Sequence, residues 1–176
     1  MQDHKTKGLV IAIAGMAGAG KTEVANFFKE KGIETVRFGS VIDEGLKEEG
    51  LPWTPENNKY YREKIRQELG MAAIAVKMLP KIEGILKTKG NVVLDGLYSW
   101  EEYLYLKKRL PKLLLLCVYA RPKIRHDRLA TRFERVWNVE EARERDIEEL
   151  EGTNKGGPIA ISDYLVKNET TKEALY

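Results

Sequence analysis

Residues 15–22 read G-M-A-G-A-G-K-T and follow directly on the apolar run 9–14. They match the pattern G-x-x-x-x-G-K-[ST], in which glycines let successive backbone N–H groups turn toward an anion. In such a loop Lys21 reaches the β and γ phosphates of a nucleoside triphosphate, and the hydroxyl group of Thr22 binds Mg²⁺. We therefore expect ATP and Mg²⁺ as ligands. The residues expected to hold the nucleotide are Gly15, Met16, Ala17, Gly18, Ala19, Gly20, Lys21 and Thr22.

The segments on either side of this loop fit the same interpretation. Residues 9–14 are rich in β-branched side chains and predict a strand. Residues 21–31 predict a helix, because Val24, Phe27 and Phe28 fall on one helical face and Gly32 can end it. A strand, a glycine-rich loop and a helix in this order are the setting in which a phosphate-binding loop occurs.

Short apolar runs alternate with helical stretches along the whole chain. This alternation predicts an α/β fold around a five-stranded, mostly parallel sheet. In such sheets ligands gather at the carboxyl ends of the strands, so the residues that follow each run are the candidates for function. The five runs are residues 9–14, 35–38, 91–94, 112–120 and 159–166.

The bulk composition limits the classes of function. A length of 176 residues suits a single domain over 1–176. The net charge is +3, from 30 basic and 27 acidic residues that alternate along the chain, so nucleic acid is not an expected partner. The first apolar run is too short for a signal sequence or a membrane span, and we expect a soluble, cytoplasmic protein without a membrane partner. The single cysteine, Cys117, lies in an apolar run and is expected to be a buried, inert thiol.

Asp95 is the candidate metal ligand outside the loop. Residues 91–97 read N-V-V-L-D-G-L, an apolar strand that ends in an acidic residue, and such a residue holds Mg²⁺ in phosphate-loop proteins. The alternative is an ordinary strand end with an Asp-Gly turn. We favour the metal role because the phosphate loop is present.

Arginines on two helical segments could neutralise phosphate charge. Arg128 and Arg132 are four residues apart and share a helical face, and Arg145 follows in R-E-R-D. Arginines on a cover over the site would stabilise the transferring phosphoryl group and exclude water. Arg66, in the helical stretch 54–87, is a candidate contact for the phosphate acceptor. The alternative for each arginine is a solvated helix with Glu–Arg pairs.

Taken in order, these motifs resemble the nucleotide kinase group of phosphate-loop proteins over residues 9–168. The closest likeness is to an archaeal family described as adenylate kinase-related or dephospho-coenzyme A kinase-related, and residues 143–166 are also similar to cytidylate kinases. The resemblance implies a three-layer core, a helical acceptor-binding insert at about 54–87 and a lid at about 121–151. It assigns Arg128 to the nucleotide base, and Arg132 and Arg145 to the phosphates. Lys21 and Asp95 complete the implied catalytic set.

Two positions depart from the monophosphate kinases of that group. Residues 39–43 read G-S-V-I-D and end in Asp43 where an arginine is usual, and Tyr98 replaces an arginine after the third strand. Both missing arginines would hold an acceptor phosphate, so an acceptor hydroxyl becomes a second option. Asp43 could then be the general base that an alcohol needs, with Tyr98 bonded to a sugar-like hydroxyl. The expected acceptor contacts are Ser40, Asp43, Arg66 and Tyr98.

The function that these features favour is phosphate transfer from ATP to a small, nucleotide-like acceptor, as in a nucleoside monophosphate kinase or a dephospho-coenzyme A kinase. The alternative from another class is a catalytically weak ATP-binding regulator or ATPase. A regulatory GTPase is not indicated, because residues 95–98 and 154–157 match neither of its motifs. The sequence leaves open the oligomeric state, the preferred donor, and whether the acceptor reacts through a phosphate or a hydroxyl.

Overall fold

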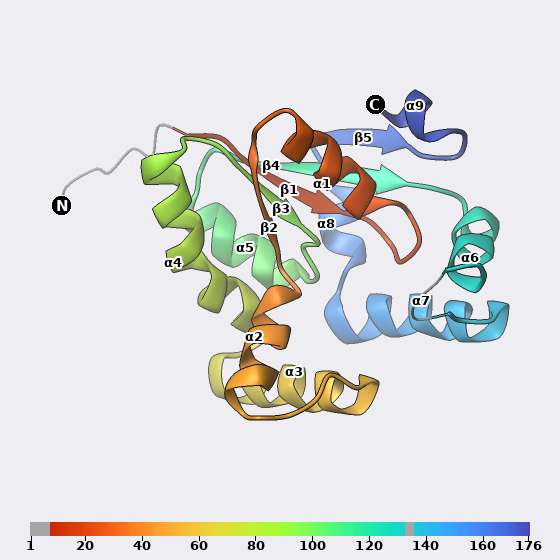
Figure 1. Cartoon of the computed structure of the whole chain (residues 1–176), viewed down its shortest axis with the longest axis horizontal. Helices are drawn as coiled ribbons and strands as arrows, with labels where there is room; N and C mark the ends of the chain where they lie inside the picture. The colour runs from red at the N-terminus through yellow and green to blue at the C-terminus, as the bar shows by residue number, and fades with distance from the viewer. Residues whose placement is uncertain (1–7, 133–135) are drawn as a thin grey trace.

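A five-stranded, entirely parallel sheet forms the centre of the molecule. The computed structural model describes residues 8–132 and 136–176. The strand order across the sheet is β2-β3-β1-β4-β5 (Figure 1). The strands are β1 Val10–Ala14, β2 Glu34–Arg37, β3 Val92–Asp95, β4 Leu113–Tyr119 and β5 Tyr164–Lys167.

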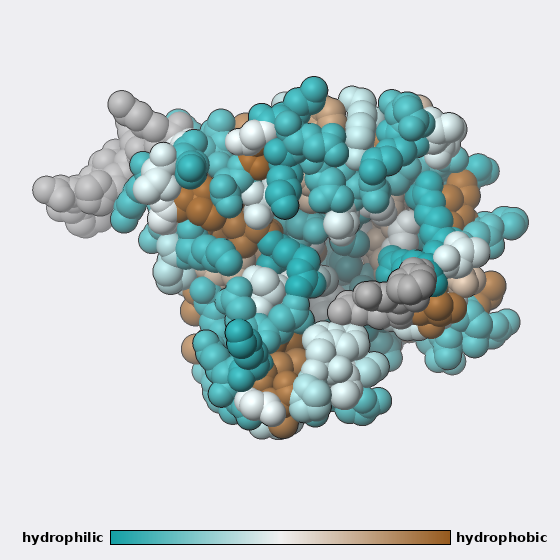
Figure 2. Space-filling view, viewed as in Figure 1, coloured by the Kyte–Doolittle hydropathy of each residue, from teal (hydrophilic) through white to brown (hydrophobic). Residues whose placement is uncertain are grey.

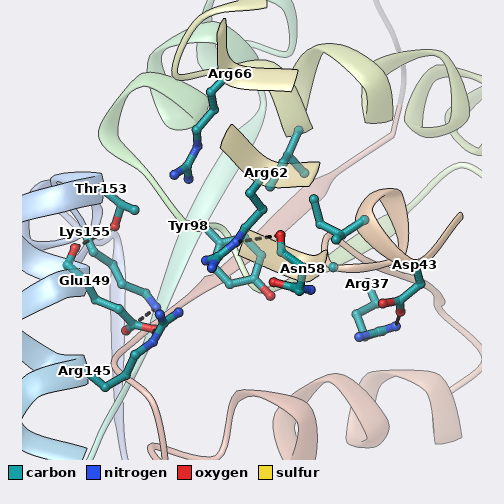
Figure 3. A pocket seen from close by; sticks show the side chains of 13 residues that line it. Arg37, Asp43, Asn58, Arg62, Arg66, Tyr98, Arg145, Glu149, Thr153 and Lys155 are labelled. Atoms are coloured by element: carbon teal, nitrogen blue, oxygen red, sulfur yellow. Dashed lines mark hydrogen bonds and ion pairs between the residues drawn. The ribbon is translucent and has the colours of Figure 1, made fainter. Parts of the chain in front are cut away.

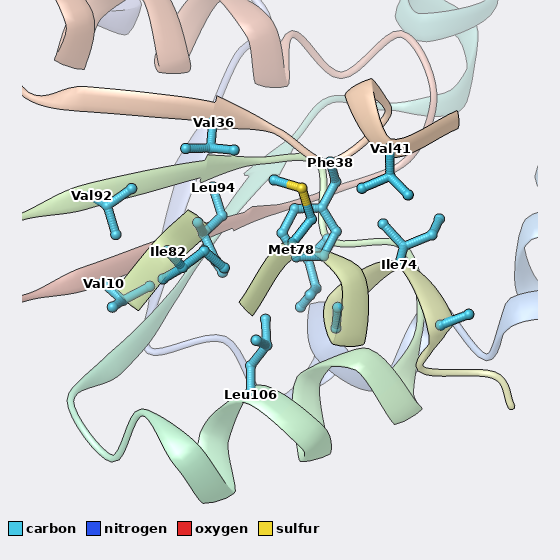
Figure 4. Close-up of a cluster of buried hydrophobic side chains, with 14 of the residues drawn as sticks. Val10, Val36, Phe38, Val41, Ile74, Met78, Ile82, Val92, Leu94 and Leu106 are labelled. Atoms are coloured by element: carbon cyan, nitrogen blue, oxygen red, sulfur yellow. The ribbon is translucent and has the colours of Figure 1, made fainter. Parts of the chain in front are cut away.

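Helices cover both faces of the sheet, which gives the predicted three-layer α/β core (Figure 1). One face carries a large cluster in which Met78, Ile82 and Leu106 pack on strand residues such as Leu94 (Figure 4). The other face carries a smaller cluster with residues of α1. The helices are α1 Lys21–Glu30, α2 Ser40–Glu48, α3 Pro55–Leu69, α4 Ala73–Thr88, α5 Trp100–Arg109, α6 Pro122–Ala130, α7 Val139–Thr153, α8 Gly156–Ala160 and α9 Lys172–Leu175.

The three central strands are almost wholly apolar, because both of their faces are covered by helices. Their register decides what lies at the carboxyl edge. Ile13 of β1 stands opposite both Asp95 of β3 and Leu116 of β4. The end of β3 therefore lies directly beside the start of the glycine-rich loop.

The fifth predicted run, residues 159–166, does not form one strand. Its first residues belong to α8, and β5 begins at Tyr164. Asp163 explains the change of structure, because its carboxylate accepts a hydrogen bond of 2.7 Å from the backbone N–H of Leu115 on β4. This hydrogen bond takes the place of the backbone hydrogen bond that would extend the pairing of the two strands. Strand β5 therefore pairs with β4 only from Leu116 onward.

The predicted insert, residues 54–87, contains two helices with different environments. In α3 only Tyr61 and Ile65 are buried, whereas α4 buries six residues, among them Ile74, Met78 and Ile82, in the core on the sheet. Helix α3 therefore stands away from the sheet beside α2, and α4 is part of the helical layer (Figure 1).

The predicted lid, residues 121–151, corresponds to α6 and most of α7, although residues 133–135 lie outside the described part of the chain. Asn138 begins α7 with a capping box, accepting a bond of 2.9 Å from the N–H of Glu141. Figure 2 shows a largely hydrophilic face that is hollowed between the α3 side and the α7 side. Within residues 8–132 and 136–176, each helix is too short or too polar to span a bilayer.

Candidate active site

The loop between β1 and α1 has a backbone that only glycine can adopt at two key points. Gly15 has φ 142° and Gly18 has φ 77°, both in the region that side chains disfavour. A Cβ atom at Gly15 would lie 2.4 Å from the carbonyl oxygen of Val118, and one at Gly18 would lie 2.6 Å from that of Arg125. The loop is therefore pressed against β4 and α6.

Lys21 begins α1 and turns its side chain back over the loop. Its Nζ donates to the carbonyl oxygens of Gly15 at 2.9 Å and Met16 at 3.1 Å. Burial, together with the nearby positive charge of Lys155, lowers the pKa of Lys21 to about 7, although Glu149 and Asp95 oppose the change. An anion bound in the loop would restore the charged form of this ammonium group.

Thr22 and Asp95 meet at the carboxyl edge of the sheet. The Thr22 hydroxyl donates to Oδ2 of Asp95 at 3.2 Å, and burial raises the pKa of this carboxyl group. Hydroxyl and carboxylate oxygens are donors that suit Mg²⁺, which takes its remaining ligands from phosphates and water. In the described ranges no cluster of three or more His, Cys, Asp or Glu forms a metal site. The pair therefore fits a metal that is bound mainly through its nucleotide.

Arg125 on α6 links the phosphate loop to α7, a role that the sequence analysis missed. Its guanidinium group donates to the Ala17 carbonyl at 3.0 Å and forms two bonds with Asp146 of α7, at 2.7 and 2.6 Å. His126 also contacts Asp146, with 2.9 Å between Nε2 and Oδ2. The loop, α6 and α7 thus share one buried ionic network.

The three predicted lid arginines occupy different places. Arg128 lies at the phosphate loop, where Nη1 is 3.5 Å from the Gly18 carbonyl and Nη2 is 3.3 Å from Oδ1 of Asn168. Arg132 is exposed just after α6, yet its charge contributes to the lowered pKa of Lys21. Arg145 lies on the other side, on α7. The structure therefore places Arg128 at the phosphate loop and Arg145 on α7, where it pairs with Glu148 and Glu149.

A cavity of about 120 Å³ lies between the end of β2, α2, α3, Tyr98, α7 and the start of α8 (Figure 3). We call it the acceptor cavity after the predicted acceptor contacts among its lining residues. Its lining is dominated by charged side chains. The lining residues are Arg37, Gly39, Ile42, Asp43, Asn58, Arg62, Arg66, Ile74, Tyr98, Arg145, Glu149, Thr153 and Lys155.

Some charges in this cavity are paired and others are not. Arg37 bonds to Asp43, and Lys155 bonds to Glu149 at 2.6 Å. Arg62 and Arg66, one turn apart on α3, have no carboxylate within ion-pair distance in the described part of the chain. Burial lowers the pKa of Arg62, and the like charges of Arg145 and Arg66 lower it further. Two adjacent guanidinium groups without a counter-ion form a site suited to an anion.

Three of the four predicted acceptor contacts line the acceptor cavity: Asp43, Arg66 and Tyr98. The phenol of Tyr98 is protonated, because burial raises its pKa to about 12. Ser40 is not among the lining residues. It starts α2, and its buried hydroxyl group has no hydrogen-bond partner within the described ranges.

Glu149 and Lys155 are cavity residues that the sequence analysis did not single out. Lys155 is 1% exposed, and its ammonium group lies 5.4 Å from the centre of the Tyr98 ring. Glu149, 7% exposed, also pairs with Arg145 at 3.4 Å. Their six-residue separation spans the end of a helix and matches no spacing rule. The only available signal was a lysine among glycines directly after an acidic helix.

Comparison with known proteins places the chain among uncharacterised archaeal relatives. A family model described as an AAA domain matches residues 11–151. The UPF0200 protein of Pyrococcus horikoshii is 36% identical over 169 residues, which cover 93% of this chain and 89% of the relative. The UPF0200 protein of Methanocaldococcus jannaschii is 38% identical over 167 residues, with 94% and 84% covered.

Solved structures resemble the chain in fold. A shikimate kinase from Bacteroides thetaiotaomicron has a TM-score of 0.60 at 13% identity, with 95% of this chain and 93% of that chain covered. A gluconokinase from Sinorhizobium meliloti has a TM-score of 0.55 at 15% identity, with 98% and 89% covered. These neighbours support a kinase-like fold in general and do not specifically point to adenylate or dephospho-coenzyme A kinases. With its phosphate loop at the end of β1, the chain is a kinase-like P-loop protein, and it belongs to the UPF0200 family.

Proposed function

We propose that the protein transfers the γ-phosphate of Mg²⁺-ATP to a small, anionic acceptor bound in the acceptor cavity. The observation that carries this proposal is that the two halves of the site adjoin at the end of β3. Asp95 bonds to Thr22 of the phosphate loop at 3.2 Å, and Tyr98, which follows closely in the chain, lines the acceptor cavity. A nucleotide in the phosphate loop would therefore direct its terminal phosphate toward the cavity.

The charge of the cavity supports a phosphate-bearing, nucleotide-like acceptor. The arginines that monophosphate kinases carry at the positions of Asp43 and Tyr98 are absent, but Arg62 and Arg66 lie in the same cavity without carboxylate partners. Paired guanidinium groups bind phosphate through parallel hydrogen bonds. They supply from α3 what the missing arginines supply from the strand ends.

In the proposed reaction the chain binds and neutralises phosphate charge. Backbone N–H groups of residues 15–22 hold the donor, and Lys21, Arg132 and Arg145 stabilise charge on the transferring group. Thr22 and Asp95 would hold Mg²⁺, which when bound neutralises charge between the β and γ phosphates. The bond from the γ phosphorus to ADP breaks as the bond to the acceptor oxygen forms.

An acceptor that reacts through a hydroxyl would also need a base. Asp43 would then take the hydroxyl proton, and Tyr98 would donate to a neighbouring oxygen of the acceptor. Asp43 is already bonded to Arg37 in the free protein, so this role requires that Arg37 turns to the acceptor. Unchanged turnover of the Asp43→Asn variant on the true acceptor would exclude the base.

The proposal is tested by coupled ADP release with Mg²⁺-ATP. The acceptors are nucleoside monophosphates, dephospho-coenzyme A, and the corresponding nucleosides without phosphate, with an acceptor-free reaction as the control. Stimulation by a phosphate-bearing acceptor and not by its nucleoside supports the proposed function. Nucleotide binding with acceptor-independent hydrolysis, and no stimulation by any compound, would instead favour the ATPase or regulator.

A further inference from the structure

The position of Lys155 is set by the sharp end of α7. Asn154, at φ 50°, adopts a left-handed conformation that ends the helix and reverses the chain before α8 begins at Gly156. The backbone N–H of Lys155 still bonds to the Glu149 carbonyl at 3.3 Å. The turn directs a fully buried lysine side chain into the acceptor cavity (Figure 3).

The charge around Lys155 is not balanced within the free protein. Glu149 pairs with Lys155 at 2.6 Å and with Arg145 at 3.4 Å, and Arg145 also pairs with Glu148 at 3.2 Å. The cavity lining as a whole still carries more positive than negative side chains: the basic residues Arg37, Arg62, Arg66, Arg145 and Lys155, and the carboxylates of Asp43 and Glu149. Lys155 also lies near the phosphate loop, because its ammonium group is 5.4 Å from the ring of Tyr98, which follows the end of β3, where Asp95 bonds to Thr22 at 3.2 Å. Burying cations without a full complement of anions is costly, and a purely structural role would be filled more cheaply by an apolar side chain. The excess of positive charge therefore marks a place for an anion.

We propose that Lys155 binds the γ-phosphate of the nucleotide from the side of the acceptor cavity, opposite Lys21. An ammonium group has three donors, so Lys155 keeps its bond to Glu149 while it donates to a γ-phosphate oxygen. Lys155 can keep this contact during transfer, while the bond from the γ phosphorus to ADP breaks and the bond to the acceptor forms. A role of Lys155 in phosphate transfer rests on the proposed function. Its contact with the γ-phosphate requires only that the protein binds the nucleotide.

If Lys155 contacts the γ-phosphate, its loss should weaken the binding of nucleotides that carry this group more than the binding of nucleotides that lack it. Loss of a purely structural ion pair would not produce this difference. Mg²⁺-AMP-PNP carries a γ-phosphate group and Mg²⁺-ADP does not, so only the first can reach Lys155. In the Lys155→Gln variant we expect the Kd for Mg²⁺-AMP-PNP to rise about tenfold or more, as for the loss of one charge-assisted hydrogen bond. The Kd for Mg²⁺-ADP should stay within about twofold of the wild-type value.

The measurement is isothermal titration of both nucleotides into the wild type, the variant and a control. Lys108→Gln is the matched control, because Lys108 is an exposed lysine on α5. If Lys155→Gln does not fold, the Lys155→Met and Glu149→Gln double variant removes both partners and is compared with Glu149→Gln alone. Equal weakening of both nucleotides, or no weakening of either, would overturn the inference.

The test is separate from that of the kinase reaction. Loss of selectivity for the triphosphate in Lys155→Gln supports the contact even when no acceptor stimulates turnover. A clear stimulation by an acceptor together with unchanged Mg²⁺-AMP-PNP affinity in the variant would leave the kinase standing and reject the role of Lys155.

Discussion

The phosphate loop and the acceptor cavity, which adjoin at the end of β3, are built in opposite ways. The loop is a continuous segment, residues 15–22, whose shape is fixed by glycine backbone geometry and by contacts with β4 and α6. The acceptor cavity takes its side chains from several separate elements, and two of its arginines lack a carboxylate partner in the described ranges. The shape of the donor half is thus fixed by its backbone, whereas the acceptor half contains positive charges that a bound anion would neutralise.

The largest effect should come from the donor half. Lys21→Ala should lower acceptor-stimulated ADP release by about a thousandfold or more, because the variant loses the cation that neutralises the transferring phosphate. Circular dichroism should show an unchanged fold. The control is Lys29→Ala, an exposed lysine on the same helix. Retained turnover in Lys21→Ala would contradict the role assigned to the phosphate loop in the reaction.

The next effect separates the two halves. Arg62→Ala and Arg66→Ala should each raise the KM for the acceptor by about 10- to 100-fold, the cost of a lost charge-assisted pair. The Kd for Mg²⁺-ADP should change by less than about twofold, because neither arginine contacts the phosphate loop. Gln67→Ala, exposed on α3, is the control. A rise in the nucleotide Kd without any rise in the acceptor KM would contradict this division.

Nucleotide binding should depend on pH through Lys21. Its pKa of about 7 in the free protein is below the ordinary 10.5, and bound phosphate should raise it again. The nucleotide should therefore be taken up with a proton above pH 7, and the Kd should rise by up to about tenfold for each further pH unit. Titrations at pH 8 in two buffers of different ionisation enthalpy measure this proton directly. Identical heats in both buffers would show that Lys21 is already charged.

The smallest effect concerns a buried carboxyl group that bonds to the backbone of Tyr98. Glu102 is fully buried, accepts from the N–H of Tyr98 at 2.8 Å, and burial raises its pKa to about 7. The folded state therefore binds more protons than the unfolded state between about pH 4.5 and 7, so wild-type stability falls as the pH rises through this range. Glu102→Gln keeps a capping-box residue and should remove this dependence.

Urea unfolding at pH 5 and pH 8 measures the effect. Relative to Glu102→Gln, the wild type should lose on the order of 1 kcal/mol of unfolding free energy between the two values. Glu101→Gln, a partly exposed neighbour on α5, serves as the control. Parallel losses in the wild type and Glu102→Gln would place the titrating group elsewhere.

The same contrast explains what the sequence could predict. The phosphate loop and four of the five apolar runs were recognised because each is a local pattern that decides its own structure. The start of the fifth run was wrong because Asp163 takes the ladder position on β4. Pro80 lies inside α4 although proline disfavours a helix interior, because the buried face of the helix outweighs this local preference.

The residues that were missed depend on partners distant in the chain. Arg125 bonds to Ala17, 108 residues away, and to Asp146, 21 residues away. Lys155 faces Tyr98 and Lys21, which only the folding of the sheet brings near. Such side chains look like solvated lid charges until the elements are in place. Charge complementarity between elements is a tertiary property, and no spacing along one helix encodes it.

Asn168 gives the phosphate loop a dependence on the order of synthesis. Its backbone N–H bonds to Tyr119 at 2.7 Å, its side-chain amide donates to the Ala19 carbonyl at 2.8 Å, and its Oδ1 accepts from Arg128. The loop is synthesised first, and the amide that braces it follows only 149 residues after Ala19. A nascent chain carries the complete phosphate-binding motif long before it carries the complete phosphate-binding site.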